Sequence, residues 1–350
     1  MTKDKRILYL DILKVIAVAG VIFNHMYLFI PASNDFYITV RFLLFSIVKP
    51  AVPIFIMVTG ALMLGRKSSY KETFTKRIPR VVIAFLIASI IYCLYKGNNP
   101  ISVFLRIFEG EVDGKNYDYI PYWGWYIYLL IALYIMTPFL QKMIKSFKDK
   151  DYKVFIFLFI ILVSIFNCLP TFTSVFLGTS DGVNSNLTTS LFSIGVGYYV
   201  FGYYISKKDI SRKENLISII IYFVSMFFCT LYLLFFSKRM ADPGYFPLEY
   251  SYFPISIASM CVFISFKYYF SKGIKNELLV KLITTISLSG FGIYLFHVPL
   301  VEEIHKLPFM MNIFNFNPLL GTVCLISLII FILTIVFYLI RKIPIFRKIF

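Results

Sequence analysis

Three ionisable side chains interrupt an otherwise apolar stretch near the start of the chain, LDILKVIAVAGVIFNHM: Asp11, Lys14 and His25. Ionisable groups inside a membrane helix are costly unless they face the bundle interior or a water-filled cavity, so they are candidate functional residues. An imidazole can carry a proton near neutral pH, as acyl transfer to a hydroxyl requires. A lysine ammonium suits the phosphate end of a long donor molecule. This stretch therefore has the residue types needed for acyl transfer.

The spacing of these residues places them on one face of a helix. Lys14 and His25 are 11 residues apart, which is three helical turns plus about 20°, or about 16 Å along the axis. That separation is of the order of a pantetheine arm, so a thioester donor could lie along this face with its acyl group at His25. Asp11 is three residues before Lys14, a spacing at which an acid and a base can pair. Asp11 and Lys14 could instead extend to the cytoplasmic interface, which His25 lies too far along the helix to reach.

The elements that must position these residues are membrane-spanning helices. The 350 residues are 59% hydrophobic and only 15% charged, against about a quarter charged in soluble domains. Nearly uncharged runs of about 18 residues or more recur along the chain, and that length lets a helix cross a bilayer. We predict an all-α, polytopic integral membrane protein with a single domain over residues 1–350 and ten spans, near 8–30, 42–64, 79–95, 122–140, 153–169, 188–205, 215–236, 251–270, 283–301 and 318–340.

The net charge of +17 indicates topology. Of the 35 Lys and Arg residues, 26 fall at the two termini and the alternate loops on one side, whereas eight, Lys49 among them, fall on the other. This asymmetry predicts that both termini are cytoplasmic and adds some attraction to anionic membrane lipid. The charges do not form the basic, aromatic surface expected of a nucleic-acid-binding protein.

The five cysteines lie in or at the ends of the predicted spans and lack pair spacing. They predict neither a disulfide framework nor a metal site, and the histidines and acids lack metal-ligand spacing as well. The abundance of Ile, Lys, Phe, Tyr and Asn suggests a bacterial protein. We therefore expect a multi-pass protein of the bacterial cell membrane that binds no metal.

Several motifs resemble those of the membrane-bound acyltransferase-3 family, in order along essentially the whole chain. Lys14-x10-His25 resembles the Arg/Lys-x10-His signature of the first helix. The others are VPIFIMVTGALML with Thr59-Gly60, FTKRIPRVVIAFL with Arg77-x-x-Arg80, YWGWYIYLLIALYIMTP, which resembles the subgroup that O-acetylates bacterial surface sugars, and ISLSGFGIYLFHVPLV with His297. Each motif alone is degenerate, whereas the set in register is specific.

The resemblance implies roles for particular residues. His25 would be the catalytic residue. Asp11 is a second catalytic candidate because it lies on the same helix face, independently of the resemblance, and it could equally be a salt-bridge partner or an interface residue. Lys14, Arg77 and Arg80 would hold the phosphates of acetyl-CoA, the acyl donor, at the cytoplasmic side. Lys14 departs from the commoner Arg, because an ammonium lacks the bidentate fork of a guanidinium. Some family members carry a fused extracytoplasmic esterase-like domain, which we do not expect here, so a separate extracytoplasmic transferase could complete the reaction.

Four further residues are candidates for substrate binding: Trp123, Trp125, Tyr126 and His297. The aromatic three could stack on an acceptor sugar, or they could belong to the aromatic belt at the outer membrane interface. His297 could serve the substrate, or it could simply hydrogen-bond to a neighbouring helix.

The leading hypothesis is a membrane O-acyltransferase that moves an acetyl or other short acyl group to a hydroxyl of a surface polysaccharide, a wall glycan or a lipid-linked sugar precursor. The alternative is a secondary transporter or exporter of a sugar or acylated product, although no internal repeat of the kind common in transporters is visible. A third possibility is a non-catalytic membrane partner of a polysaccharide synthase.

Overall fold

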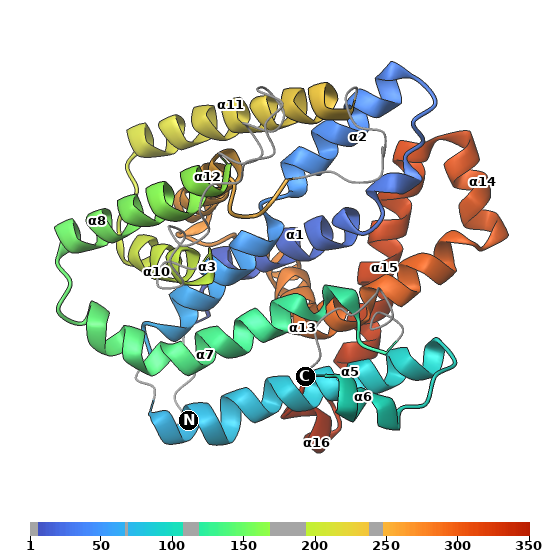
Figure 1. Ribbon diagram of the computed structural model, residues 1–350, viewed down its shortest axis with the longest axis horizontal. Helices are drawn as coiled ribbons and strands as arrows, with labels where there is room; N and C mark the ends of the chain where they lie inside the picture. Colours follow the sequence, from blue (N-terminus) through green and yellow to red (C-terminus); the bar gives the residue numbers. More distant parts are fainter. Residues whose placement is uncertain (1–5, 67–68, 108–118, 169–193, 238–247) are drawn as a thin grey trace.

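The structure is a computed structural model that describes residues 6–66, 69–107, 119–168, 194–237 and 248–350. Within these ranges every regular element is a helix, and most of the long helices run side by side across the view in Figure 1. The connection 170–187 between the fifth and sixth predicted spans lies outside the described residues, as do residues 108–118 of the connection between the third and fourth.

The helices and their bounds follow the apolar runs of the sequence. In chain order they are α1 (Leu8–Asn24), a 3-10 helix η1 (Tyr27–Phe29), α2 (Asp35–Val48), α3 (Ala51–Met63), α4 (Tyr70–Glu72), a π-helix η2 (Thr73–Arg77), α5 (Ile78–Tyr95), α6 (Ile101–Arg106), a 3-10 helix η4 (Tyr122–Gly124), α7 (Trp125–Ile144), α8 (Asp149–Phe159), a π-helix η5 (Ile160–Ile165), α10 (Ile194–Lys207), α11 (Arg212–Ser237), α12 (Phe253–Phe270), α13 (Glu277–His305), α14 (Pro308–Phe316), α15 (Pro318–Ile340) and α16 (Pro344–Arg347).

Eight helical segments of the described chain are long and apolar enough to cross a membrane. The other two predicted spans correspond to α1, with 17 residues, and α10, with 14. These results confirm an all-helical, polytopic membrane protein. The cytoplasmic location of the termini stays a prediction.

The second span differs from its prediction in a way that matters for the site. It begins at Asp35, seven residues before the predicted start at 42, and runs to Met63 as α2 and α3 together. The first turns of this helix were not predicted because the charged residues Asp35 and Arg41 interrupt the apolar run there. Lys49, assigned above to the outer side with the loop charges, lies where α2 meets α3, in the middle of this span.

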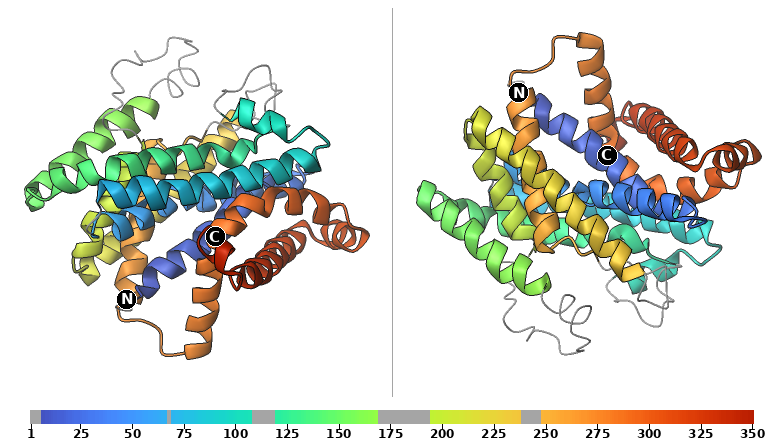
Figure 2. Two further views of the ribbon diagram at one scale, coloured as in Figure 1. Left: turned by 90° about the horizontal axis from the view of Figure 1, so that it is seen from below. Right: turned by 90° about the horizontal axis from the view of Figure 1, so that it is seen from above.

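Apolar side chains cover the outside of the bundle as well as its interior. On α11, Leu216, Phe223 and Phe228 are 57%, 63% and 59% exposed. This helix lies across the near face of the bundle when the molecule is viewed from above (Figure 2, right). An exposed face of this kind is disfavoured in water, and lipid chains can cover it.

Helix α1 lies within the bundle and contacts α13, α3, α12, α2 and α15. The neighbouring pair α3 and α10 packs with the two backbones in contact, because each helix offers a glycine at the crossing. A Cβ atom at Gly60 would lie 1.9 Å from the carbonyl oxygen of Tyr199, and one at Gly202 would lie 2.0 Å from that of Met57. Packing therefore explains the glycine of the Thr59-Gly60 motif, because a residue without a Cβ atom lets α3 approach α10 this closely.

Candidate active site

The predicted face of α1 packs along α13. A Cβ atom at Gly290 would lie 3.5 Å from Val18, which is midway between Lys14 and His25 on the same face. Further along, the two helices and α3 enclose a small apolar void, lined by Val18, Val21, Ile22, Phe55, Ile293, Tyr294 and His297. The two ends of the face therefore belong to one continuous contact between α1 and α13.

His25 is the C-cap residue of α1 and lies among aromatic and imidazole rings. Its Nδ1 is 3.2 Å from the Tyr122 hydroxyl oxygen. The centroid of its ring is 5.0 Å from that of His297, 5.5 Å from Tyr122 and 6.4 Å from Trp123. The structure thus brings His25 and His297, which are far apart in sequence, side by side.

His297 is fully buried, and its surroundings fix its tautomer. Its Nδ1 lies 2.7 Å from the carbonyl oxygen of Tyr294. Because a carbonyl only accepts hydrogen bonds, Nδ1 carries the proton, and Nε2 of the neutral ring has a lone pair. That buried Nε2 has no hydrogen-bond partner among the described residues. His297 therefore offers an unused acceptor next to His25.

The three aromatic candidates have different environments. Trp123 is 2% exposed and donates its indole N–H to the carbonyl of Leu295, while its own carbonyl accepts from the Tyr294 hydroxyl. Tyr126 is also buried, with its ring 5.2 Å from that of Tyr294. Trp123 is a wall of the histidine site and does not lie at the lipid interface. Of the three, Trp125 has the accessible ring.

Trp125 is 42% exposed and stacks on Tyr250, with ring centroids 5.5 Å apart and planes 25° apart. An exposed, stacked pair of aromatic rings is the arrangement that would allow a sugar to bind by stacking. Tyr250 belongs to the segment that leads into α12, a region to which the sequence drew no attention.

At the other end of the face, Asp11 is buried but does not form the expected ion pair with Lys14. Its carboxylate accepts from Arg6 and from the Ser287 hydroxyl, each at 2.5 Å. It lies 14 residues before His25, about 21 Å along the helix. The structure therefore does not bring the two catalytic candidates Asp11 and His25 together, and Asp11 ties α1 to α13 through Ser287.

Lys14 is half-buried and makes no hydrogen bond or ion pair to any described residue. An ammonium in this position keeps all its donors available for a ligand.

The two arginines of the Arg-x-x-Arg motif lie where α5 begins, and both have protein partners. Arg77 donates to the Glu72 carboxylate at 3.0 Å. Arg80 donates to the carbonyls of Ile349 and Phe350, at 3.1 and 3.0 Å. A phosphate could replace the Arg80 contacts, since a guanidinium forms a stronger hydrogen bond with an anionic oxygen than with a neutral carbonyl.

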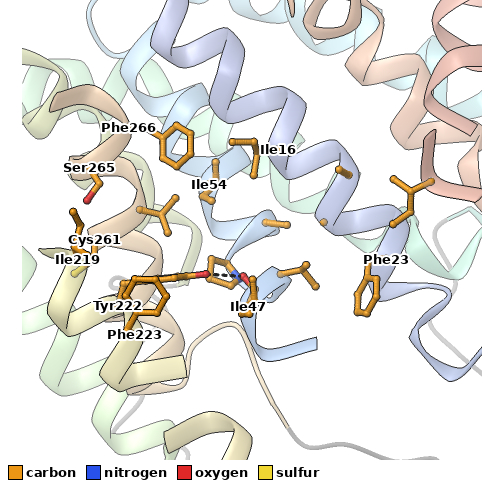
Figure 3. A pocket seen from close by; sticks show the side chains of 17 residues that line it. Ile16, Phe23, Ile47, Ile54, Ile219, Tyr222, Phe223, Cys261, Ser265 and Phe266 are labelled. Carbon is orange, nitrogen blue, oxygen red and sulfur yellow. Dashed lines mark hydrogen bonds between the residues drawn. The ribbon is translucent and has the colours of Figure 1, made fainter. Parts of the chain in front are cut away.

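A larger cavity, of about 450 Å³, lies on the opposite side of α1. Figure 3 shows its lining, to which α1 contributes Ile16 and Phe23 and α12 contributes Phe266, with Tyr222 donating to the carbonyl of Ile47. The lining is almost entirely apolar. Because Ile16 and Phe23 point away from the face that holds His25, this cavity is separate from the histidine site.

Two residues of the site were missed in the sequence. Tyr122 stands beside Trp123 in the same aromatic motif, and its contact with His25 could have been suspected only from that position. Lys49 lies with its Nζ 4.5 Å from the centroid of the Tyr250 ring, which stacks on Trp125, and a lysine before a proline inside a long apolar run was the available signal. Both depend on packing between distant helices.

The comparisons with known proteins agree with this geometry. A family described as an acyltransferase domain, acyltransferase-3, matches residues 7–341. Neither the curated proteins nor the solved structures give a match. The match includes α1, the Arg-x-x-Arg motif and α13, which together build the two ends of the site. The chain belongs to the acyltransferase-3 family of membrane acyltransferases.

Proposed function

We propose that this protein moves an acetyl group, or another short acyl group, from acetyl-CoA to a hydroxyl of a cell-surface polysaccharide, a wall glycan or a lipid-linked sugar precursor in the bacterial cell membrane. The observation that carries the proposal is the pair of imidazoles, 5.0 Å apart, at one end of the helix face that has Lys14 at its other end. This arrangement suits a long donor whose phosphates and thioester bind at opposite ends.

The reaction requires one base and one acceptor hydroxyl. His25 takes the hydroxyl proton while the hydroxyl oxygen attacks the thioester carbonyl, forming a tetrahedral intermediate. The intermediate collapses with cleavage of the C–S bond, and His25 returns the proton to the CoA thiolate. The products are the O-acyl ester and free CoA. The Tyr122 hydroxyl at Nδ1 orients the ring, and His297 provides an acceptor for a substrate donor or for the imidazolium.

An acyl-histidine route is the second way to use the same residues. His25 would then attack the thioester, release CoA and pass the acyl group on to the acceptor or to a separate extracytoplasmic transferase. Both routes need the same donor and the same residue, so they agree on which variants lose activity.

The experiment compares a deletion strain complemented with the wild-type gene or with His25→Ala. We expect the O-acetyl content of the surface glycans, measured by NMR, to disappear in the deletion strain and to return only with the wild type. Purified protein in nanodiscs, supplied with labelled acetyl-CoA, should release CoA in step with acceptor modification. Flux of a sugar across proteoliposomes without any CoA requirement would instead support the transporter hypothesis and would overturn this proposal.

A further inference from the structure

Lys49 is an ammonium inside a membrane span that the proposed reaction does not use. Its Nζ lies 4.5 Å from the ring centroid of Tyr250 and 4.8 Å from that of Phe45. It makes no hydrogen bond and no ion pair with any described residue. Glu249, next to Tyr250 in the sequence, is exposed and forms no salt bridge with it.

A buried lysine in this fold can be satisfied by the protein itself. Lys267 on α12 is buried, whereas Lys49 is half-buried, and Lys267 donates to the carbonyls of Ile205 and Lys208 at the end of α10. Lys49 lacks any such acceptor. Two aromatic faces offset part of the cost of holding a cation in the membrane, but they leave its three N–H donors available.

The position of Lys49 relates it to the histidine site through aromatic contacts. Its Nζ lies against the ring of Tyr250, which stacks on the exposed Trp125, and Trp125 follows two residues after Trp123, a wall of the histidine site. A row of groups therefore leads from an accessible indole next to the histidine site through Tyr250 to the Lys49 ammonium. Aromatic rings stack on sugars, and an ammonium binds phosphate or carboxylate.

We propose that Lys49, Tyr250 and Trp125 form the acceptor site, and that Lys49 selects acceptors carrying an anionic group, either a phosphodiester next to the sugar or a carboxylate on it. The assignment of this site to the acceptor rests on the proposed function. The preference for an anionic sugar is a binding property that can be measured without the reaction.

Intrinsic fluorescence can report this binding directly, because the chain has two tryptophans: Trp125 belongs to the proposed site, and Trp123 is two residues away in the wall of the histidine site. The protein in zwitterionic nanodiscs, without acyl-CoA, is titrated with three octyl probes below their micelle concentrations: octyl β-glucoside, octyl β-glucuronide and octyl glucosyl phosphodiester. The two anionic probes distinguish the carboxylate from the phosphate. We expect at least one of them to bind about tenfold more tightly than the neutral probe.

The variants test whether Lys49 causes the preference. Lys49→Gln should reduce the ratio of anionic to neutral affinity to about one, whereas Lys49→Arg should keep it. A wild type without preference, or a Lys49→Gln variant that retains it, would overturn the proposal, since charge elsewhere would then explain the binding. If Lys49→Gln fails to fold, the test is whether the ratio of anionic to neutral affinity in the wild type is lost in Lys49→Met. Anionic binding through Lys49 combined with no acyl transfer would overturn the proposed function alone.

Discussion

The two ends of α1 are organised differently. At the histidine end, His25, His297, Tyr122 and Trp123 come from three distant segments, and the ring of His25 lies 5.0 to 6.4 Å from the other three, centroid to centroid. At the lysine end, Lys14 has no hydrogen-bond partner among the described residues, while Arg80 is engaged by backbone carbonyls.

This difference indicates that the two ends have different roles, proton transfer at one and binding of the donor phosphates at the other. The histidine end is assembled in advance, as a site for proton transfer must be. The cation end must exchange protein contacts for phosphate oxygens when the donor binds. Substitutions at the histidine end should therefore lower kcat, and substitutions at the lysine end should raise KM for the donor.

The largest expected effect is that of His25→Ala. Loss of a general base should lower kcat/KM by roughly 10²–10⁴-fold, with stability preserved because His25 ends its helix. The measurement is acetyl transfer by purified protein in nanodiscs. His305→Ala is the matched control, since His305 stacks on Phe29, with ring centroids 3.8 Å apart, away from this site. Equal activity in both variants would remove His25 from the mechanism.

His297→Phe tests whether His25 and His297 act together at the histidine end. It keeps an aromatic ring in the buried position and removes both nitrogens, so it separates hydrogen bonding from packing. We expect a fall in kcat of about 10- to 100-fold, the value of a hydrogen bond to a charged group. Thermal unfolding in the same preparation provides the control. An unchanged kcat with an intact fold would leave His297 a structural residue.

Lys14→Gln tests whether the lysine end binds the donor. We expect KM for acetyl-CoA to rise roughly tenfold through loss of a charge-assisted contact to phosphate, while kcat changes less. Lys14→Arg should restore the wild-type KM, and higher salt should narrow the difference. The exposed Lys150→Gln provides a control of equal charge change on α8. A pure kcat effect in Lys14→Gln would contradict the division between the two ends.

Tyr122→Phe should have the smallest effect. It removes the hydroxyl that lies 3.2 Å from His25 Nδ1 and keeps the ring. The net value of a neutral hydrogen bond is about 1 kcal/mol, so kcat should fall by about fivefold. The pH profile of kcat should shift if the hydroxyl sets the orientation or the basicity of His25, and a profile that overlays the wild type would reduce Tyr122 to packing.

The fold was largely predictable because the apolar runs are long and the charges that interrupt them are few. The second span was the exception. Because Asp35 and Arg41 are charged, its start was predicted too late in the sequence, and Lys49 was assigned to the outer side. The residues of α1 were predictable for the same reason that they are functional candidates: an ionisable group is conspicuous in an apolar helix. Helical phase then placed Lys14 and His25 on one face.

Periodicity determines which face a residue occupies, and it determined that His25 and Lys14 share one. It carries no information about which other helix meets that face. The proximity of His297 and Tyr122 to His25, the pairing of Asp11 with Ser287 and the placement of Lys49 against Tyr250 all depend on contacts between segments far apart in the chain. Only the tertiary structure decided those, because glycine contacts such as Gly60 against Tyr199 set how closely helices approach and hence which side chains meet.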